Sequence, residues 1–312
     1  MIEPISSQIE LSSHRLHRVG EGVHIRAPEK EEAKTSMFTD QFVALAEGVE
    51  AEFMYRYETG ADSATTAALG LAATRIGGGV ALSMRHDVTG YWSKALGFGF
   101  AEPVTADLIG RVVEHYRSEE SPGATIQIAP QVLPTDWAEI CARHELSPGT
   151  PWVKLACGVD DLRFDAVTAL HIGPVGPGSV QEWATATLRG FGMPVGGLAD
   201  MLVSAASHPG FRPFAAWDGD QIVATANLFI HGDVASLNSA ATLPTHRNRG
   251  AQSALIAARA AAAVDAGCRW VVAETGKPGD GERDPSLSNL MRCGLRPLYE
   301  RQNWTWSPVD HG

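Results

Sequence analysis

The chain has 312 residues, 44% of them hydrophobic and 20% charged, which is enough for two cores of ordinary size. Its 25 lysines and arginines against 36 aspartates and glutamates give a formal net charge of −11, which repels nucleic-acid backbones, so we expect no nucleic-acid partner. No apolar run reaches the roughly 18–20 residues of a membrane-spanning helix. The first 36 residues are polar and lack the hydrophobic stretch of a signal peptide. We therefore expect a cytoplasmic protein without a membrane partner.

The cysteines and histidines indicate neither disulfides nor a metal. No cysteine belongs to a CxxC pair, and no two histidines have the spacing and carboxylate partner of a metal site. The sequence therefore predicts reduced thiols and no metal. The cysteines are Cys141, Cys157, Cys268 and Cys293.

The first half of the chain alternates between helical and strand patterns. Residues 1–36 show no sustained period and predict an irregular arm. From residue 37 to Tyr57, apolar residues recur three or four positions apart, which predicts an amphipathic helix. The remaining pattern predicts a domain over residues 37–160. Its strands are expected at 80–84, 125–129 and 152–156, and its further helices at 107–116 and 136–143.

The second half, residues 161–312, predicts another domain around an antiparallel meander. The turn at Asp218-Gly219 separates two apolar segments, as in a hairpin, and a third strand extends to Thr242. Along this half we expect a strand at 167–172, helices at 179–189 and 197–207, and then the meander, whose first two strands span 213–217 and 221–231. A long helix at 251–266, a strand at 269–275, a short helix and a last strand at 297–306 follow.

The stretch from Thr242 to Leu255 carries the clearest chemical signal. A strand ends at Pro244, a basic turn containing Gly250 follows, and an alanine-rich helix begins at Ala251. Free backbone amides and the positive end of a helix dipole form a site for an anion such as a diphosphate. A basic turn at a helix start can equally be a solvated cap.

This stretch resembles the hallmark of GCN5-related N-acetyltransferases, which is Pro-x-x-Arg-x-Arg-Gly-x-Gly-x-x-Leu. Pro244, Arg247, Arg249, Gly250 and Leu255 match it, whereas Gln252 replaces the second glycine. The resemblance implies acetyl-CoA as cosubstrate. The turn amides would bind its pyrophosphate, and the strand before the turn would pair with its pantetheine arm. The implied cofactor residues are Ala241, Thr242, Leu243, Arg247, Asn248, Arg249, Gly250, Ala251, Gln252, Ser253, Ser286 and Asn289. Ser286 and Asn289 could equally be a helix cap or surface residues.

The catalytic residues depart from the family pattern, because Leu290 stands where many members have a general-acid tyrosine. Acetyl transfer to an amine needs a base, and Glu274 is the preferred carboxylate on the predicted fifth strand. Tyr299 is the alternative proton donor if its side chain turns toward the groove. Either residue could instead be structural, Glu274 in a salt bridge or in solvent and Tyr299 at the edge of the core.

The first half resembles a degenerate copy of the same domain. Its corresponding turn, residues 97–103, has no arginine, and its only charged residue is Glu102, whose carboxylate would repel phosphate. We therefore expect one cofactor site, in the second half. The expected fold is α/β (α+β), with two tandem acyl-CoA N-acyltransferase-like domains, each a mixed, mostly antiparallel sheet flanked by helices.

Together these features predict transfer of an acetyl group to a primary amine of a small, cationic acceptor by direct attack in a ternary complex. Two alternatives remain open at this point. One is a non-catalytic acyl-CoA sensor or assembly protein, and the other is an acyl-thioester decarboxylase or long-chain acyltransferase on the same fold. The acceptor could be an amino sugar, a polyamine or an amino-acid derivative. The expected state is a monomer or homodimer.

Overall fold

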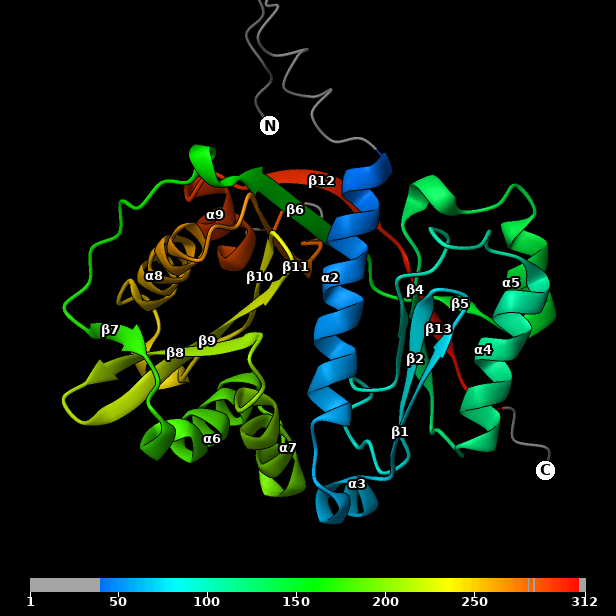
Figure 1. Cartoon of the computed structure of the whole chain (residues 1–312), viewed down its shortest axis with the longest axis horizontal. Coiled ribbons are helices and arrows are strands. Elements are labelled where there is room, and N and C mark those ends of the chain that lie inside the picture. The colour runs from blue at the N-terminus through cyan, green and yellow to red at the C-terminus, as the bar shows by residue number, and fades with distance from the viewer. Residues whose placement is uncertain (1–39, 280, 283, 309–312) are drawn as a thin grey trace, which may run out of the picture. The chain divides into compact units, whose positions relative to one another are not determined.

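The computed structural model describes residues 40–279, 281–282 and 284–308, which form two mixed sheets flanked by helices (Figure 1). The predicted arm over residues 1–36 lies outside the described residues. Each sheet is antiparallel except for one parallel pair, β3 with β4 in the first sheet and β10 with β11 in the second. The predicted fold class is confirmed. None of the described helices combines the length and apolar character needed to cross a bilayer.

The first sheet has the strand order β1-β2-β3-β4-β13-β5 in the described part of the chain. Its strands are β1 (Leu71–Ile76), β2 (Gly79–Met84), β3 (Lys94–Leu96), β4 (Ala124–Gln127), β5 (Ser147–Pro148) and β13 (Asn303–Trp306). The helices of this half are α2 (Asp40–Thr59), α3 (Ser63–Leu69), α4 (Ala106–Ser118) and α5 (Trp137–His144). The sequence pattern missed β1 and β3, which are short or half-buried and lack a clear alternation of apolar residues.

The second sheet has the order β12-β6-β11-β10-β9-β8-β7, and its predicted meander, β8-β9-β10, is confirmed. Its strands are β6 (Trp152–Gly158), β7 (His171–Pro174), β8 (Phe211–Asp218), β9 (Gln221–His231), β10 (Val234–Thr242), β11 (Trp270–Gly276) and β12 (Arg296–Arg301). Its helices are α6 (Val180–Phe191), α7 (Gly196–Ala206), α8 (Ala251–Asp265) and α9 (Pro285–Arg292). The strand predicted over 167–172 begins later, at His171.

The two sheets exchange one strand each. Strand β6, from the first half of the sequence, lies between β11 and β12, and β13, from the end of the chain, lies between β4 and β5. The single last strand predicted over 297–306 is wrong, because the chain leaves one sheet at Arg301 and enters the other at Asn303. The sequence boundary expected at residue 160 therefore does not separate the two sheets.

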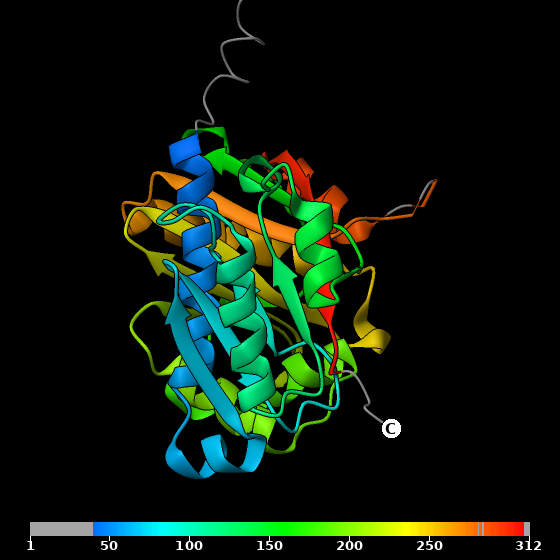
Figure 2. The ribbon, with the colours of Figure 1, turned by 90° about the vertical axis from the view of Figure 1, so that its right-hand side faces the viewer.

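Helix α2 packs against both sheets, which explains why it is buried on most of its circumference (Figure 1). In β2, Val80, Leu82 and Met84 join the core that includes α2, whereas Ala81 faces the core formed with α4 and α5. Because side chains alternate across a strand, both faces of β2 are covered and all its residues are buried. Figure 2 shows α4 in front of this sheet and α2 behind it. Helix α2 thus brings side chains of the first half to the second sheet.

Candidate active site

The site begins where β10 and β11 separate. The two strands pair in parallel from Val234 to Leu237, but β10 then continues to Thr242 along β9 and β11 continues to Gly276 along β6. The register of β10 against β9 shifts after Asn238, and Ser239 has a φ of 50°. Beyond Leu237, the edge of β10 that faces β11 therefore has no strand partner.

Buried polar contacts hold the bulge of β10 in place. The Asn227 side-chain amide donates to Asn238 Oδ1 at 2.9 Å. One guanidinium nitrogen of Arg259, on α8, donates to the carbonyls of Asn227 at 2.9 Å and Asn238 at 3.2 Å, and its Nε donates to the carbonyl of Leu255. Arg259 is 1% exposed and forms no ion pair with any described residue, and burial lowers its pKa to about 9. A positive charge therefore lies directly behind the bulge.

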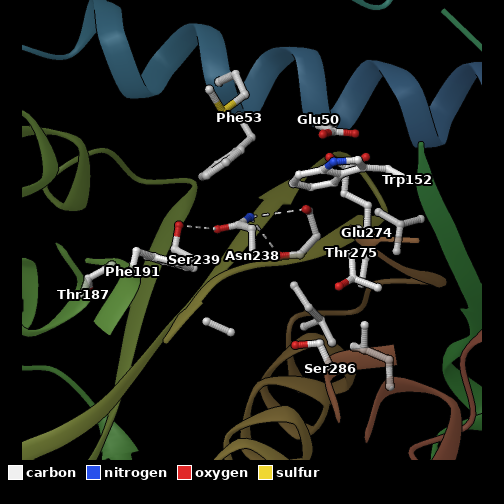
Figure 3. Close-up of a pocket in the computed structure, with 18 of the residues that line it drawn as sticks. Glu50, Phe53, Trp152, Thr187, Phe191, Asn238, Ser239, Glu274, Thr275 and Ser286 are labelled. Carbon is white, nitrogen blue, oxygen red and sulfur yellow. Dashed lines mark hydrogen bonds between the residues drawn. The ribbon is translucent and has the colours of Figure 1, made fainter. Parts of the chain in front are cut away.

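A cavity of about 400 Å³ opens in front of the bulge (Figure 3). Glu50 and Phe53 point into it from α2, opposite Ser286 on α9. Its wall includes the aromatic side chains of Phe53, Tyr57, Tyr91, Trp92, Trp152 and Phe191. The cavity thus joins the split between β10 and β11 to groups from the first half of the chain.

The turn before α8 leaves its backbone amides open. Gly250, the residue before the helix, provides no side-chain cap, and no backbone or side-chain acceptor among the described residues uses the N–H groups of 248–253. In the first half, the equivalent helix α4 is capped by Thr105, whose hydroxyl accepts from the N–H of Leu108. Only the second of these two helix starts presents its amides to an external anion.

The conformation of this turn depends on Gly250. Its φ of 79° lies in the left-handed region, and a Cβ there would come within 2.5 Å of the Val167 carbonyl oxygen. Thr168 fixes the same turn, because its hydroxyl donates to the carbonyl of Arg249 at 2.8 Å. The segment before β7 therefore stabilises the conformation of this turn.

The two arginines of the turn differ in whether a carboxylate already compensates their charge. Arg249 forms a 2.6 Å ion pair with Asp218 on β8, so part of its charge is already compensated. Arg247 is exposed and has no ion pair among the described residues. His246, in the same turn, lies 3.6 Å from the same Asp218 carboxylate. Arg247 is thus the cation of the turn that remains available to a ligand.

The predicted cofactor residues lie along one path from the turn to the cavity. Gln252 donates to the Ala241 carbonyl at 3.0 Å and to the Thr242 hydroxyl at 2.8 Å, so it fixes the end of β10. Ser253 and Asn289 are hydrogen-bonded at 3.3 Å between α8 and α9. Ala241, Thr242 and Leu243 end β10 and begin the turn. Of the predicted cofactor residues, Gln252, Ser286 and Asn289 line the cavity.

The two predicted catalytic residues lie in different places. Glu274 lines the cavity, whereas the Tyr299 hydroxyl donates to Glu47 on α2 and is not part of the cavity wall. Burial and the Glu47 carboxylate raise the pKa of Tyr299 well above its usual value. The condition for Tyr299 as the proton donor, a side chain turned toward the groove, is therefore not met, because its hydroxyl donates to Glu47.

Glu274 belongs to a buried cluster of charges, which we call the charge cluster. It consists of Glu47 and Glu50 from α2, Lys154 from β6, Glu274 from β11 and Arg301 from β12. One Glu274 oxygen accepts from Lys154 at 2.9 Å and from Arg301 at 2.6 Å. Arg301 also donates to both oxygens of Glu47 at 2.7 Å, and Lys154 contacts Glu50.

The protonation of the charge cluster follows from these contacts. Burial raises the pKa of Glu274, but Arg301 and Lys154 outweigh this effect and hold it far below its usual value. Burial and the charge of Glu274 raise the pKa of Glu50 to about 8. The proton of the pair therefore resides on Glu50, which the sequence analysis missed. Its only signal was a second glutamate three residues from Glu47 in a helix rich in apolar residues.

Among the described residues, no group of three or more histidines, cysteines, aspartates or glutamates is arranged to hold a metal ion.

Comparison with known proteins agrees with this geometry. The fold resembles a GCN5-related N-acetyltransferase from Kribbella flavida, with a TM-score of 0.56 and 17% identity over 85% of this chain and 96% of that one. It also resembles one from Sphaerobacter thermophilus, with a TM-score of 0.54 and 15% identity over 73% and 80% of the two chains. No curated protein matches the chain by sequence.

A tandem arrangement is also found among the solved structures. The tandem GNAT protein from the clavulanic acid biosynthesis pathway matches with a TM-score of 0.53 and 16% identity over 87% of this chain and 97% of that one. By sequence, residues 181–283 match the Acetyltransferase (GNAT) family. Residues 181–283 therefore match the GNAT family model and the fold resembles that of GNAT acetyltransferases, so the resemblance seen in the sequence is confirmed.

Proposed function

We propose that the protein transfers the acetyl group of acetyl-CoA to a primary amine. The observation that carries this proposal is the continuous path from the uncapped start of α8 to the split between β10 and β11. The amides of 248–253 and the side chain of Arg247 would hold the diphosphate. Residues 241–243, where β10 ends, would pair with the pantetheine arm through the backbone groups that the Gln252 side chain leaves open, which brings the thioester to the cavity.

The bulge of β10 supports the chemical step. A thioester carbonyl gains negative charge as the amine attacks, and fixed dipoles or cations near this oxygen lower the barrier. The Arg259 guanidinium, which lines the cavity, donates to the carbonyls of Asn227 and Asn238 and so fixes the bulge. Backbone N–H groups of the bulge and this buried charge would therefore favour the developing oxyanion.

One cofactor site is expected because the first half is closed at the equivalent position. Thr105 occupies the amide at the start of α4, and Phe98, in the turn after β3, is 1% exposed. A Cβ on Gly99 would lie 2.6 Å from a methyl group of Val132, so this turn is already filled. Glu102 forms an ion pair with Arg111 and adds a carboxylate where a diphosphate would lie.

Calorimetric titration with acetyl-CoA tests the cofactor site. Arg247→Glu reverses an exposed, unpaired charge of the turn and should weaken binding by at least about tenfold, because charge-assisted contacts contribute roughly 1.5–3 kcal/mol each. The matched control is Arg143→Glu on α5, which is also exposed and without an ion pair in the described structure. It should bind like the unmodified protein, with one site per chain.

The result decides between the functions that the fold allows. One site that Arg247→Glu weakens, together with amine-dependent thiol release, supports acetyl transfer. Binding without thiol release from any amine would favour an acyl-CoA sensor or assembly protein, and carbon dioxide release from a malonyl thioester would favour a decarboxylase. Two sites per chain would show that the first half is not silent. No binding would remove acetyl-CoA from the proposal.

A further inference from the structure

The charge cluster contains one more carboxylate than cation. Glu47, Glu50 and Glu274 face Lys154 and Arg301, and the remaining titratable neighbour, Tyr299, stays neutral. Since an uncompensated buried charge is costly, these five groups by themselves are neutral only when one carboxyl keeps its proton. Glu50 lines the cavity, so a positively charged ligand there can take the place of that proton.

The other two carboxylates have less capacity for a ligand. Both oxygens of Glu47 accept from Arg301, and Tyr299 donates to one of them. Glu274 accepts from both cations through one oxygen. Glu50, by contrast, makes a close contact with one cation, Lys154, and lies 3.7 Å from the other, Arg301. The carboxyl that can exchange a proton for a ligand cation is therefore Glu50.

Glu50 shares the cavity wall with Lys154 and Glu274 and with a large set of apolar side chains. Phe53, Met54 and Tyr57 line the cavity from α2, and Trp92 and Trp152 line it as well. A hydroxyl-rich amino sugar would lose hydrogen bonds to water against these side chains, at roughly 1–3 kcal/mol for each unsatisfied group. A polyamine would bring a second ammonium for which the charge cluster has no further carboxylate. An aromatic or aliphatic body fits both the walls and the charge.

We propose that the acceptor is a primary amine with one positive charge and an apolar body, whose nitrogen lies against Glu50, and that Glu50 takes its proton. This proposal names the substrate class of the proposed function and rests on it. Glu50 comes from the first half of the chain, so that half supplies a catalytic residue although its own cofactor turn is closed.

The proton balance of the reaction is complete with these groups. The ammonium enters as Glu50 loses its proton to solvent, and Glu50 then takes one proton back from the ammonium. The neutral nitrogen attacks the thioester carbon, the carbon–nitrogen bond forms and the carbon–sulfur bond breaks. The second nitrogen proton goes to the leaving sulfur. Amide and free thiol leave, Glu50 is protonated again, and one proton in total has been released.

Calorimetry with 2-phenylethylamine, spermidine and glucosamine tests the proposal on the full chain in the presence of coenzyme A. Titrations in two buffers of different ionisation enthalpy measure the protons released at pH 7. The unmodified protein should bind 2-phenylethylamine at least tenfold more tightly than the other two amines and release close to one proton. Glu50→Gln should bind it at least tenfold more weakly and release none, whereas Glu50→Asp should restore part of both.

The matched control is Glu114→Gln, an equal change on the exposed face of α4 without an ion pair in the described structure. It should leave affinity and proton release unchanged. Equal binding by Glu50→Gln, or release of no proton by the unmodified protein, would overturn the role of Glu50. Tighter binding of spermidine or glucosamine would overturn the substrate class. Amine binding with proton release but without acetyl transfer would overturn the proposed function and leave the amine site standing.

Discussion

The raised pKa of Glu50 predicts how the stability of the protein changes with pH. In the unfolded chain this carboxyl has a pKa near 4.5, whereas in the folded protein burial and the charge of Glu274 raise it to about 8. Between these values the folded protein holds a proton that the unfolded chain has lost. Raising the pH therefore favours unfolding until Glu50 is ionised in the folded state.

The size of the change in stability follows from the shift in the pKa of Glu50. From about pH 6.5 to about pH 8, the stability contributed by Glu50 should fall by about 2 kcal/mol, since each pKa unit corresponds to about 1.4 kcal/mol. This loss should lower the melting temperature by about 4 °C in a chain of this size. The groups that face Glu50 are Glu47 and Lys154, together with Glu274 and Arg301, and none of these titrates in this range.

The assay is thermal unfolding of the unmodified protein and of Glu50→Gln at both pH values. Glutamine has the shape of the protonated acid and can still donate to Glu274, so the variant should fold and should lose the pH-dependent part of the change. The control variant Glu114→Gln should keep the pH-dependent change in melting temperature. The same decrease in melting temperature in Glu50→Gln and in the unmodified protein would refute the assignment of the extra proton to Glu50.

Four further changes test the other parts of the structure. Lys154→Met leaves three buried carboxylates with one cation and should lower the free energy of unfolding by about 3–5 kcal/mol, measured by denaturant titration. Gly250→Ala places a Cβ against a carbonyl oxygen at positive φ. It should lower the free energy of unfolding by about 1–3 kcal/mol and weaken acetyl-CoA binding in calorimetry. The same change at Gly178, where a Cβ has open space, should lower the free energy of unfolding by less. Arg259→Met leaves two carbonyls of the bulge unbonded, and we expect a loss of about 2–3 kcal/mol together with slower thiol release. Truncation after residue 302 removes β13 from the middle of the first sheet, so limited proteolysis should cleave that half first; equal resistance of both halves would contradict the strand exchange.

Local signals in the sequence predicted the parts of the fold that depend on neighbours in the chain. The meander of β8, β9 and β10 follows from a tight turn at Asp218-Gly219 and from apolar strands on either side of it. The start of α8 follows from Gly250 and the basic residues before it. Both features are encoded within about ten residues, and the structure forms them where the sequence predicts them.

Contacts between distant segments were not predictable in the same way. Residues 297–306 read as one strand, yet Arg301 enters the charge cluster of the second sheet while Trp306 packs with Tyr116 of α4. A strand pattern states that a segment pairs but not with which sheet, because the partner depends on contacts more than a hundred residues away. The direction of the Tyr299 side chain could not be predicted for the same reason, since its partner Glu47 lies 252 residues earlier.

The strand exchange explains why the charge cluster can exist at all. Lys154 reaches Glu274 only because β6 lies beside β11, and Arg301 reaches it only because β12 lies beside β6. The two glutamates of α2 come from the first half, which packs against the same strands. Glu47, Glu50 and Lys154 come from the first half of the sequence and Glu274 and Arg301 from the second, so separating the halves would leave buried charges without partners. The position proposed for the amine is therefore a product of the tandem arrangement, whereas the path proposed for the cofactor lies within the second half.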